Sequence, residues 1–152
     1  MWNELVGLVD EVRRTHNTLV AVGDDLHAGT GISTRLRAVL EYLSHHGPTT
    51  VPEIARARRV TRQHIQTAVN ELLTLSLVAY KPNPQHRRSH LVALTRAGAR
   101  TIDEMQLAEQ TALGPRLAGL DPHHIAAATE TLRSLRAALP DPEARLDPKD
   151  TP

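Results

Sequence analysis

The sequence predicts a mostly helical fold that carries one small β-hairpin. Apolar residues recur at alternating intervals of three and four through most of the chain, which is the pattern of amphipathic helices. Two short apolar runs, 77–81 and 90–94, indicate strands joined by a connection that contains two prolines. With 152 residues, of which 40 % are hydrophobic and 23 % charged, the chain suits a single domain, expected over residues 1–139.

The first helix is expected over residues 2–22. Its apolar residues form a narrow seam: Leu5, Leu8, Val12, Leu19, Val22 and Leu26. Three glycines that follow are expected to end this helix: Gly23, Gly29 and Gly31. Ser33 or Thr34 can cap a second helix, which ends before Gly47-Pro48. A short third helix is predicted to begin at Thr50.

A fourth helix is predicted over residues 61–75, with Thr61 as its N-cap. Its apolar residues share one face: Ile65, Ala68, Val69 and Leu72. At about 100° per residue, polar residues occupy the opposite face and its flank: Gln63, Gln66, Thr67 and Asn70. Amide and hydroxyl side chains of this kind pair with base edges in the major groove, where one α-helix fits. The capped N-terminus, next to Arg62, offers free backbone N–H groups to a phosphate.

The connection between the two strands, residues 82–89, has a basic tip and is expected to project from the domain. Helix, tight turn, helix and basic hairpin together predict a winged helix-turn-helix. Such a hairpin reaches the neighbouring minor groove or the DNA backbone. The predicted DNA-binding residues are Thr61, Arg62, Gln63, Gln66, Thr67, Asn70, His86, Arg87 and Arg88.

The C-terminal part, residues 96–139, is expected to be helical again. Thr95 can cap a helix that kinks or ends at Gly114-Pro115, and Asp121-Pro122 starts another. This last helix has a regular apolar stripe: Ile125, Ala128, Leu132, Leu135 and Leu139. Because such stripes would otherwise be exposed, we expect part of them to form a dimer interface. Residues 140–152 hold four prolines and alternating charges, which predicts a disordered tail.

The net charge of +1 hides a strongly basic segment in the middle of the chain. Residues 51–100 carry nine basic and two acidic side chains, a net charge of +7, whereas the rest of the chain carries −6. A concentrated positive field favours a polyphosphate partner, because neutralising phosphates releases counterions. The plainer alternative is a basic solvated surface without a partner. Aromatic residues make up 2 % of the chain, so the predicted partner is duplex DNA rather than a stacked single strand.

Several segments follow one another in a recognisable order. They are Gly47-Pro48-Thr49-Thr50-Val51-Pro52-Glu53-Ile54-Ala55, Val60-Thr61-Arg62-Gln63, Leu77-Val78, His86-Arg87-Arg88 and Leu94-Thr95-Arg96-Ala97-Gly98. In this order and spacing the chain resembles the MarR family, the multiple antibiotic resistance regulators, over about residues 2–139. The resemblance implies a homodimer built from helices 2–22 and 96–139, and a DNA-binding lobe at 32–95. It also implies a pseudo-palindromic operator, since the symmetry of the DNA site mirrors that of the dimer.

The resemblance also implies a small-molecule effector that controls DNA affinity. We expect its pocket where the dimer helices meet the lobe, lined by some of His16, Leu19, Tyr42, His45 and His46. One residue departs from the family pattern, in which an aspartate two positions before the tip arginine braces that arginine. Here His86 precedes Arg88, so this ion pair is lost, whereas a protonated histidine could contact a phosphate.

Other classes of function find little support in the sequence. The chain has no cysteine, which excludes disulfides, thiolate zinc sites and thiol-based redox sensing. Its nine histidines lack metal-ligand spacing, and no catalytic motif is recognisable, so no cofactor, metal or enzymatic activity is expected. No apolar run is long enough to span a membrane, and we expect a cytoplasmic protein. A protein-interaction module or a metal-responsive sensor of the same fold are the alternatives.

Overall fold

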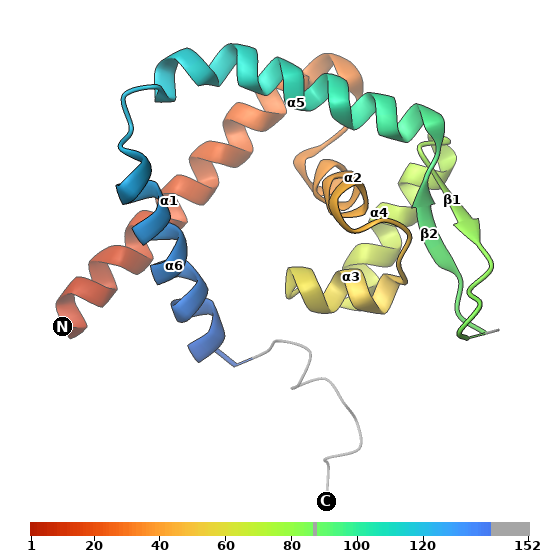
Figure 1. The fold of residues 1–152 in the computed structure, drawn as a ribbon, viewed down its shortest axis with the longest axis horizontal. Helices are drawn as coiled ribbons and strands as arrows, with labels where there is room; N and C mark the ends of the chain where they lie inside the picture. Colours follow the sequence, from red (N-terminus) through yellow and green to blue (C-terminus); the bar gives the residue numbers. More distant parts are fainter. Residues whose placement is uncertain (87, 141–152) are drawn as a thin grey trace, which may run out of the picture.

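The computed structural model describes residues 1–86 and 88–140, and it confirms the mostly helical fold with a small hairpin (Figure 1). The helices are α1 (Trp2–His27), the 3-10 turn η1 (Ala28–Thr30), α2 (Thr34–His46), α3 (Val51–Arg58), α4 (Arg62–Thr74), α5 (Arg96–Leu117) and α6 (Pro122–Ala138). The strands are β1 (Val78–Lys81) and β2 (Leu91–Leu94). Arg87, predicted to contact DNA, and residues 141–152 of the expected tail lie outside the described residues.

One helix continues beyond its predicted end, because α1 passes through Gly23 and reaches His27. Of the two outcomes expected at Gly114-Pro115, a kink or an end, α5 does not end there and continues to Leu117. A single glycine inside a helix costs about 1 kcal/mol relative to alanine, which is too little to stop a helix that gains tertiary packing. After η1 the chain turns at Gly31, whose φ of +70° favours glycine.

Helices α2, α3 and α4 pack with the hairpin into a lobe around one hydrophobic core, which Ile102 and Met105 of α5 complete. The fully buried side chains of this core include Leu40, Leu43, Ile54, Val69, Leu72, Val92 and Ile102. The strands pair antiparallel, with Val78 opposite Leu94. Thr49 and Val92 exchange two further backbone hydrogen bonds of 3.1 and 2.8 Å. The hairpin is therefore fastened to the start of α3, which keeps it beside the helix-turn-helix.

Side-chain caps begin the helices where the sequence predicts them. Five N-cap side chains accept a hydrogen bond from a backbone N–H of the first turn: Ser33, Thr50, Thr61, Thr95 and Asp121. Of the two residues expected for α2, Ser33 is the cap. Each bond satisfies one of the N–H groups that a helix start leaves without a partner, and removing such a cap costs about 1 kcal/mol.

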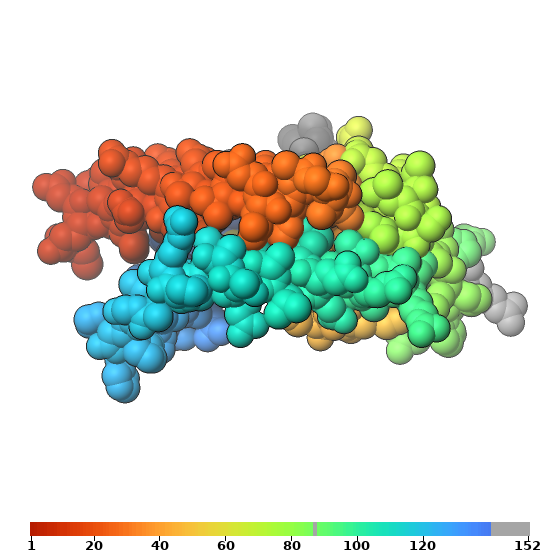
Figure 2. All heavy atoms as spheres, turned by 90° about the horizontal axis from the view of Figure 1, so that it is seen from above, coloured from red at the N-terminus to blue at the C-terminus, as the bar shows by residue number. Residues whose placement is uncertain are grey.

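The remaining helices form an arm, which we define as α1, the outer half of α5, and α6. α5 leaves the lobe and crosses the C-terminal end of α1, whereas the N-terminal part of α1 runs away from α5 (Figure 1). Seen from above, the two helices form one side of the molecule (Figure 2). Of the residues in α1 and α6, which are all described, His27 alone is buried. Large apolar side chains of these two helices and of the C-cap of α6 stay exposed: Val6, Val12, Leu19, Ile125, Leu132 and Leu139. The chain itself buries no residue of the two predicted apolar seams: five are half-buried (Leu5, Leu8, Val22, Leu26 and Leu135) and the others are exposed.

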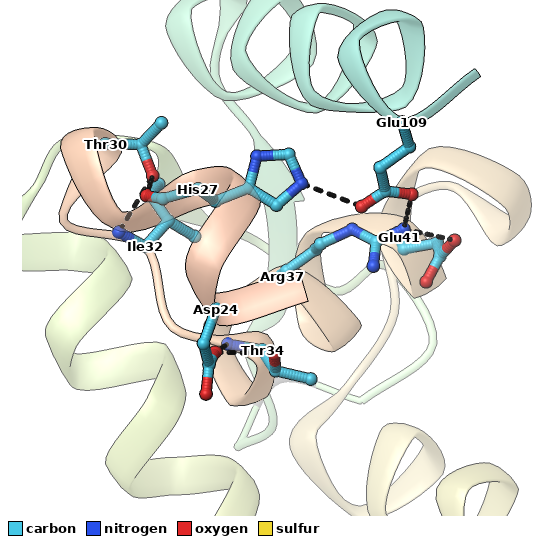
Figure 3. A network of polar contacts seen from close by, with 8 residues as sticks. All are labelled: Asp24, His27, Thr30, Ile32, Thr34, Arg37, Glu41 and Glu109. Carbon is cyan, nitrogen blue, oxygen red and sulfur yellow. Dashed lines mark hydrogen bonds and ion pairs between the residues drawn. The ribbon is translucent and has the colours of Figure 1, made fainter. Parts of the chain in front are cut away.

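A polar network joins the arm to the lobe (Figure 3). His27, at the end of α1, is 4 % exposed, and its Nε2 lies 2.7 Å from Oε1 of Glu109 on α5. The other carboxylate oxygen of Glu109 accepts a hydrogen bond of 2.6 Å from Arg37 on α2. Nearby, Asp24 accepts hydrogen bonds from the side chain and backbone of Thr34, which lower the pKa of that carboxyl. These contacts hold the ends of α1 and α2, which are neighbours in sequence, to α5, which follows about 70 residues later.

Candidate nucleic-acid interface

The outward face of α4 is the centre of the candidate interface. Oγ1 of Thr61 accepts a hydrogen bond of 3.2 Å from the backbone N–H of His64, so the first turn is capped as predicted. The predicted apolar face is buried in the lobe: Ile65, Ala68, Val69 and Leu72. The predicted polar residues lie on the other faces: Arg62, Gln63, Thr67 and Asn70 are exposed, and Gln66 is half-buried. The structure therefore brings the predicted residues of this helix together on one surface.

The hydroxyl of Thr67 is not a free donor on this surface. It donates a hydrogen bond of 2.9 Å to the backbone carbonyl of Gln63, one turn earlier in α4. Thr67 therefore presents its methyl group and the acceptor lone pairs of its hydroxyl oxygen. A threonine methyl group suits the C5-methyl group of thymine in the major groove.

Gln66 contacts a residue that the sequence did not single out. Its Nε2 donates hydrogen bonds to Oδ1 of Asn70, at 2.8 Å, and to the hydroxyl of Tyr80 on β1, at 2.9 Å. Tyr80 lies 14 residues away in the chain, and its place beside α4 depends on how the hairpin packs against that helix. The spacing of apolar and polar residues within one helix gives no indication of a contact with a distant strand. Tyr80 was therefore not predicted as a residue of the interface.

The connection between β1 and β2 carries the predicted wing residues. Backbone turns shape it, because the N–H of His86 donates to the carbonyl of Asn83, at 3.3 Å, and the N–H of Ser89 donates to the carbonyl of His86, at 3.0 Å. His86 and Arg88 are both exposed. The hairpin projects from the lobe beside α4 (Figure 1). A charged wing tip is thus held on the same lobe as the polar face of α4.

Both acidic residues of the basic segment are occupied by other contacts. Glu53 accepts three hydrogen bonds of 2.6–2.9 Å through one carboxylate oxygen, from Oγ1 of Thr49 and from the backbone N–H and Oγ1 of Thr50. These bonds lower the pKa of Glu53 to about 2. Glu71 forms an ion pair with Arg35 of α2.

Two arginines of the basic segment lie at the turn between α3 and α4. Arg58, the last residue of α3, is exposed. Arg59 has a positive φ of 53°, and its guanidinium donates hydrogen bonds to the carbonyl oxygens of Arg136, at 2.6 Å, and Leu139, at 3.1 Å. It therefore binds the open C-terminal end of α6, where cations are favoured.

The predicted effector-pocket residues fall into two groups. His16 and Leu19 line an apolar groove of about 490 Å³ between α1 and α6, together with Val12 and Leu132. Tyr42, His45 and His46 lie on α2, where the ring of Tyr42 stacks on that of His46 at 4.2 Å and packs against the lobe core. The structure does not bring the five residues together in this groove.

Within the described part of the chain, no three histidine, aspartate or glutamate side chains gather closely enough to hold a metal ion. The described helices also include none with the length and apolarity needed to cross a membrane.

The geometry defines a class of protein. A short helix, a tight turn, a capped helix with a polar outward face and a flanking basic hairpin form a winged helix-turn-helix, a fold that places its second helix in the major groove of DNA. The sequence model that defines the MarR family matches residues 30–89 of this chain, which cover the lobe as far as the wing. An uncharacterized protein of Mycobacterium tuberculosis is 31 % identical over 140 residues, which are 91 % of this chain and 96 % of that protein.

Solved structures share this fold over most of its length. A crystal structure of a MarR family transcription regulator, SP03579, superposes with a TM-score of 0.75 at 25 % identity and covers 89 % of each chain. A mutant MarR from E. coli, complexed with operator DNA, gives a TM-score of 0.75 at 19 % identity, with 89 % of this chain and 97 % of that chain covered. The chain belongs to the MarR family of winged-helix transcription regulators.

Proposed function

We propose that this protein binds duplex DNA sequence-specifically as a homodimer and so regulates transcription. The observation that carries the proposal is the surface of α4, which presents Gln63, Gln66, Thr67 and Asn70 opposite its buried stripe and beside the wing. In this arrangement α4 lies in the major groove with these residues toward the base edges. Its capped start at Thr61, with Arg62, holds a phosphate. The role is one of binding, without catalysis, and the chromosomal partner favours a cytoplasmic location.

The wing has a positioning role in this proposal. Arg88 lies exposed on a hairpin beside α4, which suits a contact in the neighbouring minor groove, and Arg87 and His86 would contact the phosphates next to it.

The arm is the proposed dimer interface. α1 and α6 expose apolar stripes that one chain leaves largely uncovered, and a second copy can bury them. Two lobes, each spanning about residues 32–95, would then contact two half-sites of a pseudo-palindromic operator. The operator complex formed by the E. coli family member of the same fold supports this arrangement.

Control by a small-molecule effector is the final part of the proposal. A ligand bound within the arm, or where the arm meets the lobe, could change the spacing of the two DNA-binding lobes. The apolar groove that contains His16 and Leu19 is one candidate place, and Tyr42, His45 and His46 of α2 form a second candidate region.

Selection of bound duplexes from a random pool tests the DNA-binding proposal. We expect one enriched pseudo-palindromic sequence. Gln63→Ala should then weaken preference at one operator position by about 1–3 kcal/mol and leave binding to random duplex unchanged. Arg88→Ala should weaken binding to all sequences. If no sequence is enriched, or if neither variant changes binding, the DNA-binding surface has been assigned wrongly and a protein-interaction role becomes the better account.

A further inference from the structure

Gln66, Asn70 and Tyr80 form a connected polar cluster on the proposed DNA-binding surface, which we call the Gln66 triad. Gln66 and Asn70 lie one turn apart on α4, whereas Tyr80 comes from β1. Nε2 of Gln66 is 2.8 Å from Oδ1 of Asn70 and 2.9 Å from the hydroxyl of Tyr80. The triad therefore links the helix proposed to contact bases with the strand that leads into the wing.

Tyr80 is itself held in place at the edge of this surface. Its ring centroid lies 5.8 Å from that of His90, just before β2, with an angle of 49° between the rings. In the sheet, Tyr80 pairs with Val92, the strand residue that is also bridged to Thr49. The side chain nevertheless remains 43 % exposed. An exposed tyrosine hydroxyl on a rigid hairpin is thus directed at a glutamine of α4 rather than at solvent alone.

The contacts of Gln66 restrict what its carboxamide can offer to DNA. A glutamine amide has two N–H donors and one carbonyl acceptor. Both contacts in the triad engage Nε2, which leaves Oε1 as the atom available to a base edge. A glutamine on an exposed helix face otherwise samples many rotamers, and ordering such a side chain on binding costs affinity. A glutamine that is already held in one orientation avoids much of this cost.

We propose that Tyr80 is a specificity-determining positioning residue, whose hydroxyl orients the Gln66 carboxamide for its contact with one operator base pair. This inference rests on the proposed DNA-binding function. It predicts that the hydroxyl of Tyr80 affects sequence preference more than overall affinity, because Tyr80 acts through Gln66. Tyr80→Phe removes this hydroxyl and keeps the ring beside His90, so the fold should be unchanged.

The first experiment uses the free protein and needs no DNA. The side-chain NH₂ resonances of Gln66 are followed by NMR in the full-length protein. Tyr80→Phe should move both resonances toward those of a solvent-exposed glutamine, because one of the two hydrogen bonds is lost. Tyr42→Phe is the matched control, since it removes the chain's other tyrosine hydroxyl, on α2, and should leave them unchanged. Unchanged Gln66 resonances in Tyr80→Phe would overturn the inference.

In the second experiment, affinities are measured for the selected operator, for operators with single base-pair changes, and for random duplex. Tyr80→Phe should reduce discrimination by about three- to tenfold at the base pair that Gln66→Ala also affects, with unchanged affinity for random duplex. A variant that combines Tyr80→Phe with Gln66→Ala should discriminate between base pairs no worse than Gln66→Ala alone, because both changes remove the same contact with DNA. Additive losses, or full discrimination by Tyr80→Phe, would overturn the positioning role. A wild-type protein that prefers no sequence would instead contradict the proposed function, and the specificity role with it.

Discussion

At the scale of single residues, close backbone approaches and side-chain caps hold this fold together. Gly98, in the first turn of α5, is buried against the backbone of Leu77. A Cβ atom added to Gly98 would lie 1.9 Å from the carbonyl oxygen of Leu77, which also accepts a hydrogen bond from Thr95. The start of α5 can therefore approach the hairpin this closely because residue 98 lacks a side chain.

Gly98→Ala should accordingly destabilise the protein by about 3 kcal/mol, since backbone at both sides must shift to relieve the overlap. Gly7→Ala, near the start of α1, is the control, because a Cβ there would meet nothing within 4 Å outside its own helical turns and no proline follows it. That change should stabilise by about 0.5–1 kcal/mol through the higher helix propensity of alanine. The free energies of unfolding of both variants, measured by urea titration, test this difference. Equal stabilities would mean that α5 does not meet the hairpin as described.

The capping box of α3 should make stability depend on pH. Hydrogen bonds from Thr50 and Thr49 lower the pKa of Glu53 from 4.5 to about 2. A lowered folded-state pKa contributes stability that is present above pH 4.5 and is lost as the pH falls toward 2. Because Glu53 is exposed and screened, Glu53→Gln should cost about 0.5–1 kcal/mol near neutral pH.

The difference in unfolding free energy between wild type and Glu53→Gln, measured by urea titration, should shrink as the pH falls below about 4.5. Glu104→Gln, on an exposed part of α5, supplies the control and should show no such trend. A difference that stays constant from pH 6 down to about pH 2 would show that the carboxylate charge does not act in the cap.

At the scale of secondary-structure elements, the arm and the lobe differ in how they are stabilised. The lobe has a closed core to which α2, α3, α4 and the hairpin all contribute. α6 contributes no buried residue, although it is described over its whole length, and the end of α6 is held by Arg59 of the lobe. Such an arm gains most of its apolar burial when a second chain covers it.

Leu132→Glu should therefore convert the proposed dimer into a folded monomer. Leu132 lies on α6, is 41 % exposed and lines the groove against α1. A carboxylate there would have to be desolvated in the dimer interface. Leu75→Glu introduces the same charge at an exposed leucine of the lobe and should leave the dimer intact. Light scattering at micromolar concentration distinguishes the two outcomes, and a wild-type protein that is already monomeric would refute the arm as an interface.

The elements could be predicted because their signals are local. Caps such as Thr61 and Thr95 act within one turn, and the apolar faces of the helices follow from a fixed rotation per residue. The contacts between elements could not be predicted in this way. His27 and Glu109 are 82 residues apart, and the Gln66–Tyr80 contact requires the hairpin to lie beside α4. The end of α1 was misplaced for a related reason, since packing at the junction outweighs the low helix propensity of Gly23.

At the scale of the whole molecule, charge is distributed in accordance with the two proposed roles. The segment 51–100 has a net charge of +7, and its two acidic residues are held by Thr49, Thr50 and Arg35, while the rest of the chain carries −6. The arm can thus pair with another arm away from DNA, while the lobe and its wing present the positive field to the phosphates. We therefore expect DNA to bind across α4 and the wing.

The salt dependence of duplex affinity tests whether DNA binds across α4 and the wing. Fluorescence anisotropy would give dissociation constants of wild type and Arg88→Ala for operator and random duplex over a series of salt concentrations. Affinity should fall steeply with salt, by about 0.9 in the log–log slope for each neutralised phosphate, and Arg88→Ala should lower the slope by about one. The operator should be preferred at every concentration. A flat salt dependence, or a slope that Arg88→Ala leaves unchanged, would contradict the proposed binding surface.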